Sequence, residues 1–109
     1  MIDQHTWNLY DRQADVLKAL GHPIRVAIVN MLLDGERCVC QIFPEMDCDR
    51  TNISKHLAIM TRAGVLRSRN DGLKVYYSLR TPCVANFLSC AATTLKNKAA
   101  EDARALARI

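Results

Sequence analysis

The chain has 109 residues, of which 50% are hydrophobic and 24% are charged, so it can form one folded domain with a core and is not expected to be disordered. No apolar run approaches the roughly 20 residues that a membrane-spanning helix needs. The first residues lack the basic and apolar blocks of a signal peptide, which favours a cytoplasmic protein. Five cysteines are expected to be reduced there, which favours thiol chemistry or metal binding over a disulfide framework.

The first half of the chain reads as four helices. Apolar spacing predicts a helix over residues 8–20 and a second one over 22–35, with glycine at the end of each. A short third helix is expected over 38–46, where an internal proline limits its regularity. A fourth helix is predicted over 50–63, because Gly64 is typical of the residue that follows a helix end.

The second half predicts a hairpin and a closing helix. Residues 65–69 and 74–79 read as strands, joined by a turn over 70–73. A last helix is expected over 82–109, and its tail from residue 96 onward, rich in alanine and charge, is prone to fraying. Together these elements predict a mainly α fold with a β-hairpin wing (α+β), a winged helix-turn-helix in one domain of residues 1–109. We call 50–63 the recognition helix and 65–80 the wing.

Positive charge is concentrated in this part of the chain. Residues 50–80 contain seven basic side chains and one acidic side chain, a net charge of +6, whereas the whole chain carries only +4. The other 78 residues therefore sum to −2. A local basic field of this kind is typical of a surface that meets a phosphate backbone, so we expect double-stranded DNA as a partner.

The recognition helix has one apolar and one polar side. Ile53, Leu57 and Met60 recur at helical spacing and are expected to anchor it to the core. Asparagine and lysine on the opposite side can pair with the edges of nucleic-acid bases. Hydroxyl groups of the helix and basic side chains of the wing suit phosphate contacts. His56 is open to a second interpretation, as a histidine at the edge of the core. The predicted DNA-binding residues are Thr51, Asn52, Ser54, Lys55, His56, Arg62, Arg67, Arg69 and Lys74.

Five segments carry a resemblance to a known family, in order and spacing: Gly21-His22-Pro23-Ile24-Arg25, Cys38-Val39-Cys40-Gln41-Ile42, Asn52-Ile53-Ser54-Lys55-His56-Leu57, Ala63-Gly64-Val65-Leu66 and Gly72-Leu73-Lys74-Val75-Tyr76-Tyr77-Ser78-Leu79. Over residues 15–90 the chain resembles the ArsR/SmtB family of metal(loid)-responsive repressors, and the C-x-C pair places it closest to the arsenic-sensing branch. The resemblance implies a homodimer, joined through its first and last helices, that leaves a palindromic operator when an inducer binds. One departure is Phe43, which stands where many arsenic sensors have a third cysteine.

Cys38 and Cys40 are the predicted primary metal ligands. Arsenite and antimonite prefer thiolates, as do other soft metal ions, so As(III) or Sb(III) is the expected inducer and other soft ions are open. In a regular helix residues two apart point about 200° apart, so both sulfurs can hold one ion only where the helix start is irregular. Binding is then expected to distort the third helix and shift the recognition helix. The alternative is two small apolar residues at a helix start.

The remaining cysteines have open roles. Cys83 and Cys90 share one face of the last helix but lie about 10 Å apart along it, so one ion cannot join both in a straight helix. They can form a second soft-metal site, supply a third ligand to the first, or pack in an interface. Cys48 is either a core residue or a thiol activated by the following helix start.

Three other functions compete with the metalloid-responsive repressor. The same fold can sense oxidants or reactive sulfur through a disulfide or polysulfide bridge. A thiol oxidoreductase needs C-x-x-C spacing in a βαβ context, which this chain lacks, and no catalytic acid–base group stands out, so we predict no enzyme. A structural zinc domain would use four cysteines.

Overall fold

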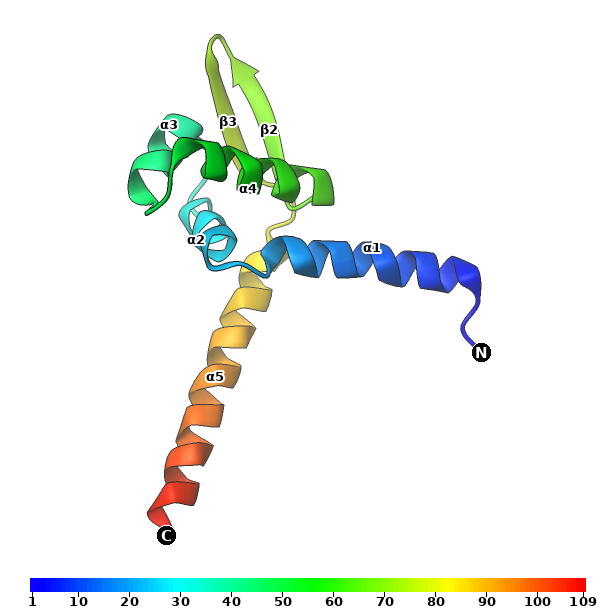
Figure 1. Cartoon of the computed structure of the whole chain (residues 1–109), viewed down its shortest axis with the longest axis vertical. Coiled ribbons are helices and arrows are strands. Elements are labelled where there is room, and N and C mark those ends of the chain that lie inside the picture. The colour runs from blue at the N-terminus through cyan, green and yellow to red at the C-terminus, as the bar shows by residue number, and fades with distance from the viewer.

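The computed structural model describes all residues, 1–109, as five α-helices, one 3₁₀ turn and a three-stranded antiparallel sheet. In chain order they are α1 (Gln4–Leu20), α2 (Pro23–Met31), β1 (Arg37–Cys38), α3 (Val39–Ile42), η1 (Phe43–Glu45), α4 (Arg50–Ala63), β2 (Leu66–Asp71), β3 (Lys74–Leu79) and α5 (Cys83–Ala107). In Figure 1, α2, α3, α4 and the sheet form one body, from which α1 and α5 extend in different directions. The predicted winged helix-turn-helix is confirmed. None of the helices combines the length and hydropathy needed to cross a bilayer.

One core of twelve buried residues holds the central body together. Ile53, Leu57 and Met60 of α4 are fully buried in it, as the sequence predicted. Ile28 and Val29 of α2 are equally inaccessible. Burying a side chain of this size contributes about 1.5–3 kcal/mol relative to exposure, so the apolar stripe of α4 fixes which of its faces points outward.

The first and last helices are longer than their predicted regular parts. α1 begins at Gln4 because the Asp3 carboxylate caps it, accepting the Thr6 N–H at 2.8 Å. α5 stays helical to Ala107, so the expected fraying of its tail is wrong. Alanine has the highest helix propensity, and charge pairs four residues apart add support. α2, in contrast, ends at Met31, before the predicted stop.

Much of α1 and α5 packs against nothing in the chain. Only Ala19 and Leu20 of α1, and Val84 of α5, are buried. The two helices carry most of the large apolar side chains that are exposed, namely Trp7, Leu9, Tyr10, Leu17, Phe87, Leu95 and Leu106. Apolar faces on two projecting helices indicate an interaction surface.

The segment predicted as one helix over 38–46 is three short elements instead. Cys38 belongs to β1, where it lies opposite Tyr76 of β3. α3 then runs for four residues, and Pro44 sits in the 3₁₀ turn that follows. Proline lacks an N–H and its ring clashes with the preceding turn, which explains the early end of α3. β1 was missed because two residues carry no strand pattern of their own; the partner strand defines them.

The wing is a tight hairpin with a shorter turn than predicted. β2 runs on through Asp71, which pairs with Lys74, so only Gly72 and Leu73 form the turn. Gly72 has a φ of 62° while no non-glycine residue has positive φ, the pattern of a two-residue turn with glycine first. Leu66 and Tyr77 face the core, so the alternate positions of both strands face outward.

Gly64 ends the recognition helix in a conformation that favours glycine. Its φ is 92°, and its N–H closes the last turn of α4. We expect Gly64→Ala to lower the free energy of unfolding by about 1–2 kcal/mol, measured by urea denaturation. Gly21→Ala is the matched control, because Gly21 also follows a helix but has a φ of −82°. Equal stability losses in the two variants would contradict this account of Gly64.

Candidate nucleic-acid interface and thiol site

The predicted face of the recognition helix is open to solvent. Burial of Ile53, Leu57 and Met60 turns the opposite side of α4 outward. Every predicted DNA-binding residue of this helix is exposed except His56: Thr51, Asn52, Ser54, Lys55 and Arg62. α4 can therefore enter a groove with its polar side while its apolar stripe stays in the core.

Asp49 caps this helix and was not singled out from the sequence. Its carboxylate accepts the backbone N–H of Asn52 at 2.8 Å, and the Asn52 side-chain amide lies 3.4 Å from its second oxygen. The available signal was an aspartate directly before the helix start, a preferred N-cap. Asp49 thus orders the first turn and places one negative charge beside an otherwise basic surface.

His56 is held by the protein itself, unlike its exposed neighbours. Its Nδ1 accepts the Arg25 Nε–H at 3.0 Å, and its ring lies 4.5 Å from that of His22. Burial, followed by the charges of His22 and Arg25, lowers the pKa of His56 below its ordinary value. The His22 side chain in turn caps α2 by accepting the Ile24 N–H at 3.1 Å. His56 therefore joins α4 to α2, and a DNA contact through it stays a prediction.

The three predicted wing bases share one face of the hairpin. Arg67 and Arg69 alternate along β2, while Asp71 of the same face pairs with Lys74 of β3. Residues directly opposite in a ladder project to the same side of the sheet. The three basic side chains therefore project together, away from the side that packs on the core. All three are exposed. The hairpin thus presents a basic outer face beside α4.

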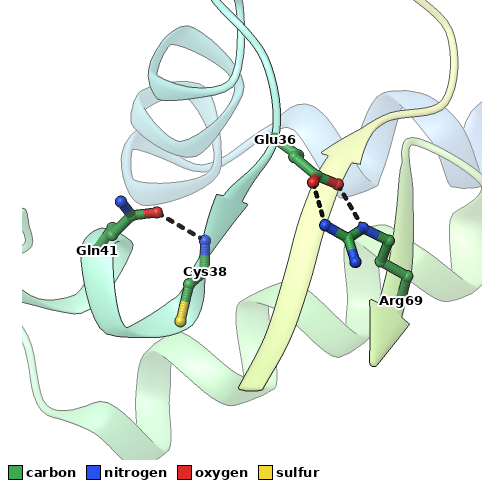
Figure 2. Close-up of polar contacts among 4 residues, drawn as sticks. All are labelled: Glu36, Cys38, Gln41 and Arg69. Carbon is green, nitrogen blue, oxygen red and sulfur yellow. Dashed lines mark hydrogen bonds and ion pairs between the residues drawn. The ribbon is translucent and has the colours of Figure 1, made fainter. Parts of the chain in front are cut away.

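Arg69, in the middle of the wing, is already engaged within the protein. Its guanidinium donates from two nitrogens to the Glu36 carboxylate, with Nε 2.9 Å from one oxygen, and it stacks over the Tyr76 ring, 4.6 Å from the centroid. Figure 2 shows Glu36 reaching across to Arg69 from the segment that leads into β1. The hydrogen bond from Arg69 lowers the pKa of Glu36 and raises that of Arg69 itself.

Cys38 and Cys40 meet at the start of α3, where they form a disulfide with Cα atoms 5.1 Å apart. They can meet because Cys38 has an extended backbone, with ψ of 149°, and only Cys40 is helical. The irregular helix start that the spacing demanded is therefore present. Because Cys38 already lies outside the helix, the two sulfurs can meet without unwinding α3; a distortion of α3 on binding stays a prediction.

Hydrogen bonds hold this sulfur pair in place. The Cys40 N–H donates to Cys38 Sγ at 3.1 Å, and the Gln41 side-chain oxygen accepts the Cys38 N–H at 3.0 Å (Figure 2). Cys38 is 2% exposed, whereas Cys40 is exposed to solvent. Cys38 is therefore buried beside the sheet, and Cys40 is accessible from solvent.

The other cysteines do not complete the pair within one chain. No group of three histidine, cysteine or carboxylate side chains is placed to hold a metal ion. Cys83 and Cys90 are exposed on α5, and Cys48 is half-buried beside the core. The core placement of Cys48 agrees with one of its two predicted roles.

Known proteins share both the sequence and this architecture. A model described as "Bacterial regulatory protein, arsR family" matches residues 22–68. The uncharacterized HTH-type transcriptional regulator Rv0081 of Mycobacterium tuberculosis is 34% identical over 88 residues, 80% of this chain and 77% of the relative. Its crystal structure matches with a TM-score of 0.75 at 31% identity, over 85% of this chain and 94% of the other.

Two further comparisons agree, one in fold and one in sequence. The homodimeric winged helix-turn-helix DNA-binding domain Mb0332 of Mycobacterium bovis matches with a TM-score of 0.77 at 26% identity, covering 89% and 90% of the two chains. A probable mercury resistance operon repressor of Streptomyces lividans is 29% identical over 90 residues, 83% of this chain and 72% of the relative. Fold and exposed helix face thus define a DNA-binding regulator of transcription, not an enzyme. The chain belongs to the ArsR family of bacterial regulatory proteins.

The lowered pKa of His56 predicts a fold that weakens in acid. Between the folded pKa and the unfolded value near 6.5, the unfolded chain binds a proton more readily, so the free energy of unfolding falls as pH drops below about 6.5. His56→Gln keeps an acceptor for Arg25 but cannot be protonated. We expect its melting temperature to vary less than the parent's between about pH 7.5 and 5.5, whereas the exposed control His5→Gln should follow the parent. The same acid loss in His56→Gln as in the parent would contradict this assignment.

Proposed function

We propose that the protein is a homodimeric transcriptional repressor that leaves a palindromic operator when a thiophilic ion binds Cys38 and Cys40. As(III) or Sb(III) is the preferred inducer, and other soft metal ions suit the same donors. The main observation behind this proposal is that the two sulfurs lie together at the junction of β1 and α3. Cys38 is two residues from Glu36 and opposite Tyr76. A repressor of this kind acts in the cytoplasm.

In this proposal α4 reads the major groove and the wing holds the backbone. Thr51, Asn52 and Lys55 lie on the exposed first half of α4, where side chains can reach base edges or flanking phosphates. Arg67 and Lys74 on the outer wing face suit phosphate or minor-groove contacts. Arg69 can join them by leaving Glu36, so DNA and Glu36 compete for this guanidinium.

A second copy of the chain is the proposed partner of α1 and α5. Both helices expose apolar side chains such as Trp7 and Leu95, which gain stability when a neighbour covers them. The related Mycobacterium bovis domain is homodimeric. Two-fold symmetry would present α4 twice, which accounts for the proposed palindromic operator.

The coupling from sulfur to DNA runs through the sheet in this proposal. Cys38 and Tyr76 are opposite residues of the β1–β3 ladder, and Tyr76 lies opposite Arg69 in the β2–β3 ladder. Glu36, two residues before Cys38, forms a second connection to the wing through its ion pair with Arg69. An ion that repositions the Cys38 sulfur therefore acts on the strand that carries the wing. A displaced wing would destabilise the DNA-bound state more than the DNA-free state, and this difference would lower the affinity for DNA.

Two thiolates leave room for a third ligand. Water, a small anion or a side chain from the second subunit can fill that position, and Cys83 and Cys90 are exposed candidates on the proposed dimer helix. The probable mercury repressor among the relatives agrees with a soft-metal signal. A separate site at Cys83 or Cys90, completed by a ligand from the second subunit, is the second-ranked metal proposal.

One observation favours a second candidate function. Cys38 and Cys40 are joined as a disulfide, and a reversible bond between them would reposition the same β1 residue as a bound ion. The alternative signal is then an oxidant or a reactive sulfur species. Operator release by persulfide without metalloid would favour this alternative, whereas release by arsenite under reducing conditions favours the ion.

Cys38→Ser and Cys40→Ser test the sensor. Serine is a preferred N-cap residue, so its hydroxyl at position 38 should keep the capping role of the sulfur. We expect both variants to bind operator within about threefold of the parent, a difference under about 1 kcal/mol. Arsenite should no longer release them at concentrations that release the parent, measured by fluorescence anisotropy.

Cys48→Ser is the matched control and should respond to arsenite like the parent. Cys83→Ser and Cys90→Ser report whether α5 supplies the third ligand, through a weakened but retained response. Full induction of either Cys38→Ser or Cys40→Ser would exclude the C-x-C pair as the sensor.

Lys55→Ala tests the recognition helix. Losing one phosphate contact should reduce the slope of log K against log salt by about 0.9, whereas a lost base contact should weaken specific binding more than nonspecific binding. Lys96→Ala is the control, because Lys96 is also exposed and belongs to α5, a helix that extends away from α4. Unchanged affinity and slope in Lys55→Ala would show that this face does not meet DNA.

A further inference from the structure

A basic pocket lies where α1, α2 and α4 meet, apart from the thiol site. It encloses about 270 Å³. Lys18 of α1, Arg25 of α2 and Arg62 of α4 bring three positive charges to it, and Asp15 brings one negative charge. The rest of the lining is apolar: Ala19, Ile59 and Ala63.

Arg25 is the central feature of this pocket. It is half-buried, and its Nε donates to His56 while Nη1 donates to the Lys18 carbonyl oxygen at 3.1 Å. Those bonds use two of the five N–H groups of a guanidinium. The ion pairs of the chain are Glu36–Arg69 and Lys98–Asp102, so neither Asp15 nor any other carboxylate neutralises Arg25. A partly buried cation with free donors gains from an anion beside it.

The pocket opens beside the face of α4 that we assign to DNA. Arg62 follows Lys55 by seven residues and Thr51 by eleven, spacings that return within about 20° to one side of a helix. The pocket thus lies about 10 Å along the axis from Lys55, toward the C-terminal end of α4. An anion there would flank the groove that the first half of α4 reads.

We propose that this pocket holds a phosphate group of the operator backbone, bound by Lys18, Arg25 and Arg62. The inference rests on the proposed DNA interface of α4 and extends it to α1 and α2. A guanidinium offers paired N–H donors to phosphate oxygens, and a lysine adds a mobile point charge. Because Arg25 also binds His56, a phosphate held here would fix the docking angle of the recognition helix.

Two exposed residues of the pocket test this with opposite signs. Lys18→Gln keeps the backbone carbonyl that Arg25 uses but removes one charge; its operator affinity should fall several-fold and its salt slope by about 0.9. Asp15→Asn removes the opposing charge, so its affinity should rise above the parent's. Arg108→Gln, at the far end of α5, is the matched control and should leave both quantities unchanged.

A second arm identifies the source of the phosphate. Inorganic phosphate is titrated into the DNA-free protein at constant ionic strength, and the Arg25 Nε–H resonance is followed by NMR, with chloride as reference. In one outcome the parent binds the operator specifically, while Lys18→Gln and Arg108→Gln show the same slope of log K against log salt. This result would overturn the backbone-phosphate site and leave the proposed function standing. If inorganic phosphate then shifts Arg25, the pocket takes a free anion. Absence of operator binding by the parent would overturn both.

Discussion

The pairing of β1 with β3 is the constraint on which the account of signalling depends. It places Cys38 opposite Tyr76 and within two residues of Glu36, which binds Arg69 of the wing. Without β1, the thiol segment would be a loop attached to a short helix, with no direct connection to the hairpin. With it, the buried Cys38 belongs to the same sheet as the exposed Arg67, Arg69 and Lys74. A movement of Cys38 can then be passed to the wing through the backbone pairing of β1 with β3 and through the Glu36–Arg69 ion pair.

The core explains why such a change can reach the outer surface. Ile53, Leu57 and Met60 bury α4 completely on one side, so the recognition helix has little freedom to roll independently of the body. The wing is fixed less firmly, because only one face of its hairpin packs on the core. We therefore place the movable part of the DNA-binding surface in the wing, and the rigid part in α4. His56 and Arg25 add a second fixed point between α4 and α2.

Elements with local signals could be predicted from the sequence, and elements defined by distant partners could not. The α4 boundaries matched because periodic apolar residues and a glycine stop are properties of the segment itself. β1 carries no such signal, since its two residues become a strand only against Tyr76 and Tyr77. The Glu36–Arg69 pair and the Arg25–His56 bond likewise span more than 30 positions. The basic face could be predicted from the composition of residues 50–80. The ion pair that holds Arg69 on that face could not, because its partner Glu36 is distant in the sequence.

The route from sulfur to wing can be observed directly by NMR of the reduced protein bound to operator DNA. Arsenite is added stepwise while the Tyr76 amide, the Arg69 Nε–H and the fraction of bound DNA are recorded together. Our account requires both resonances to shift with one equivalent of arsenite per thiol pair, in step with release of the DNA. The DNA-free protein with and without arsenite is compared as well. Full release of the DNA, with Tyr76 and Arg69 resonances that are the same in these two DNA-free samples, would contradict the account.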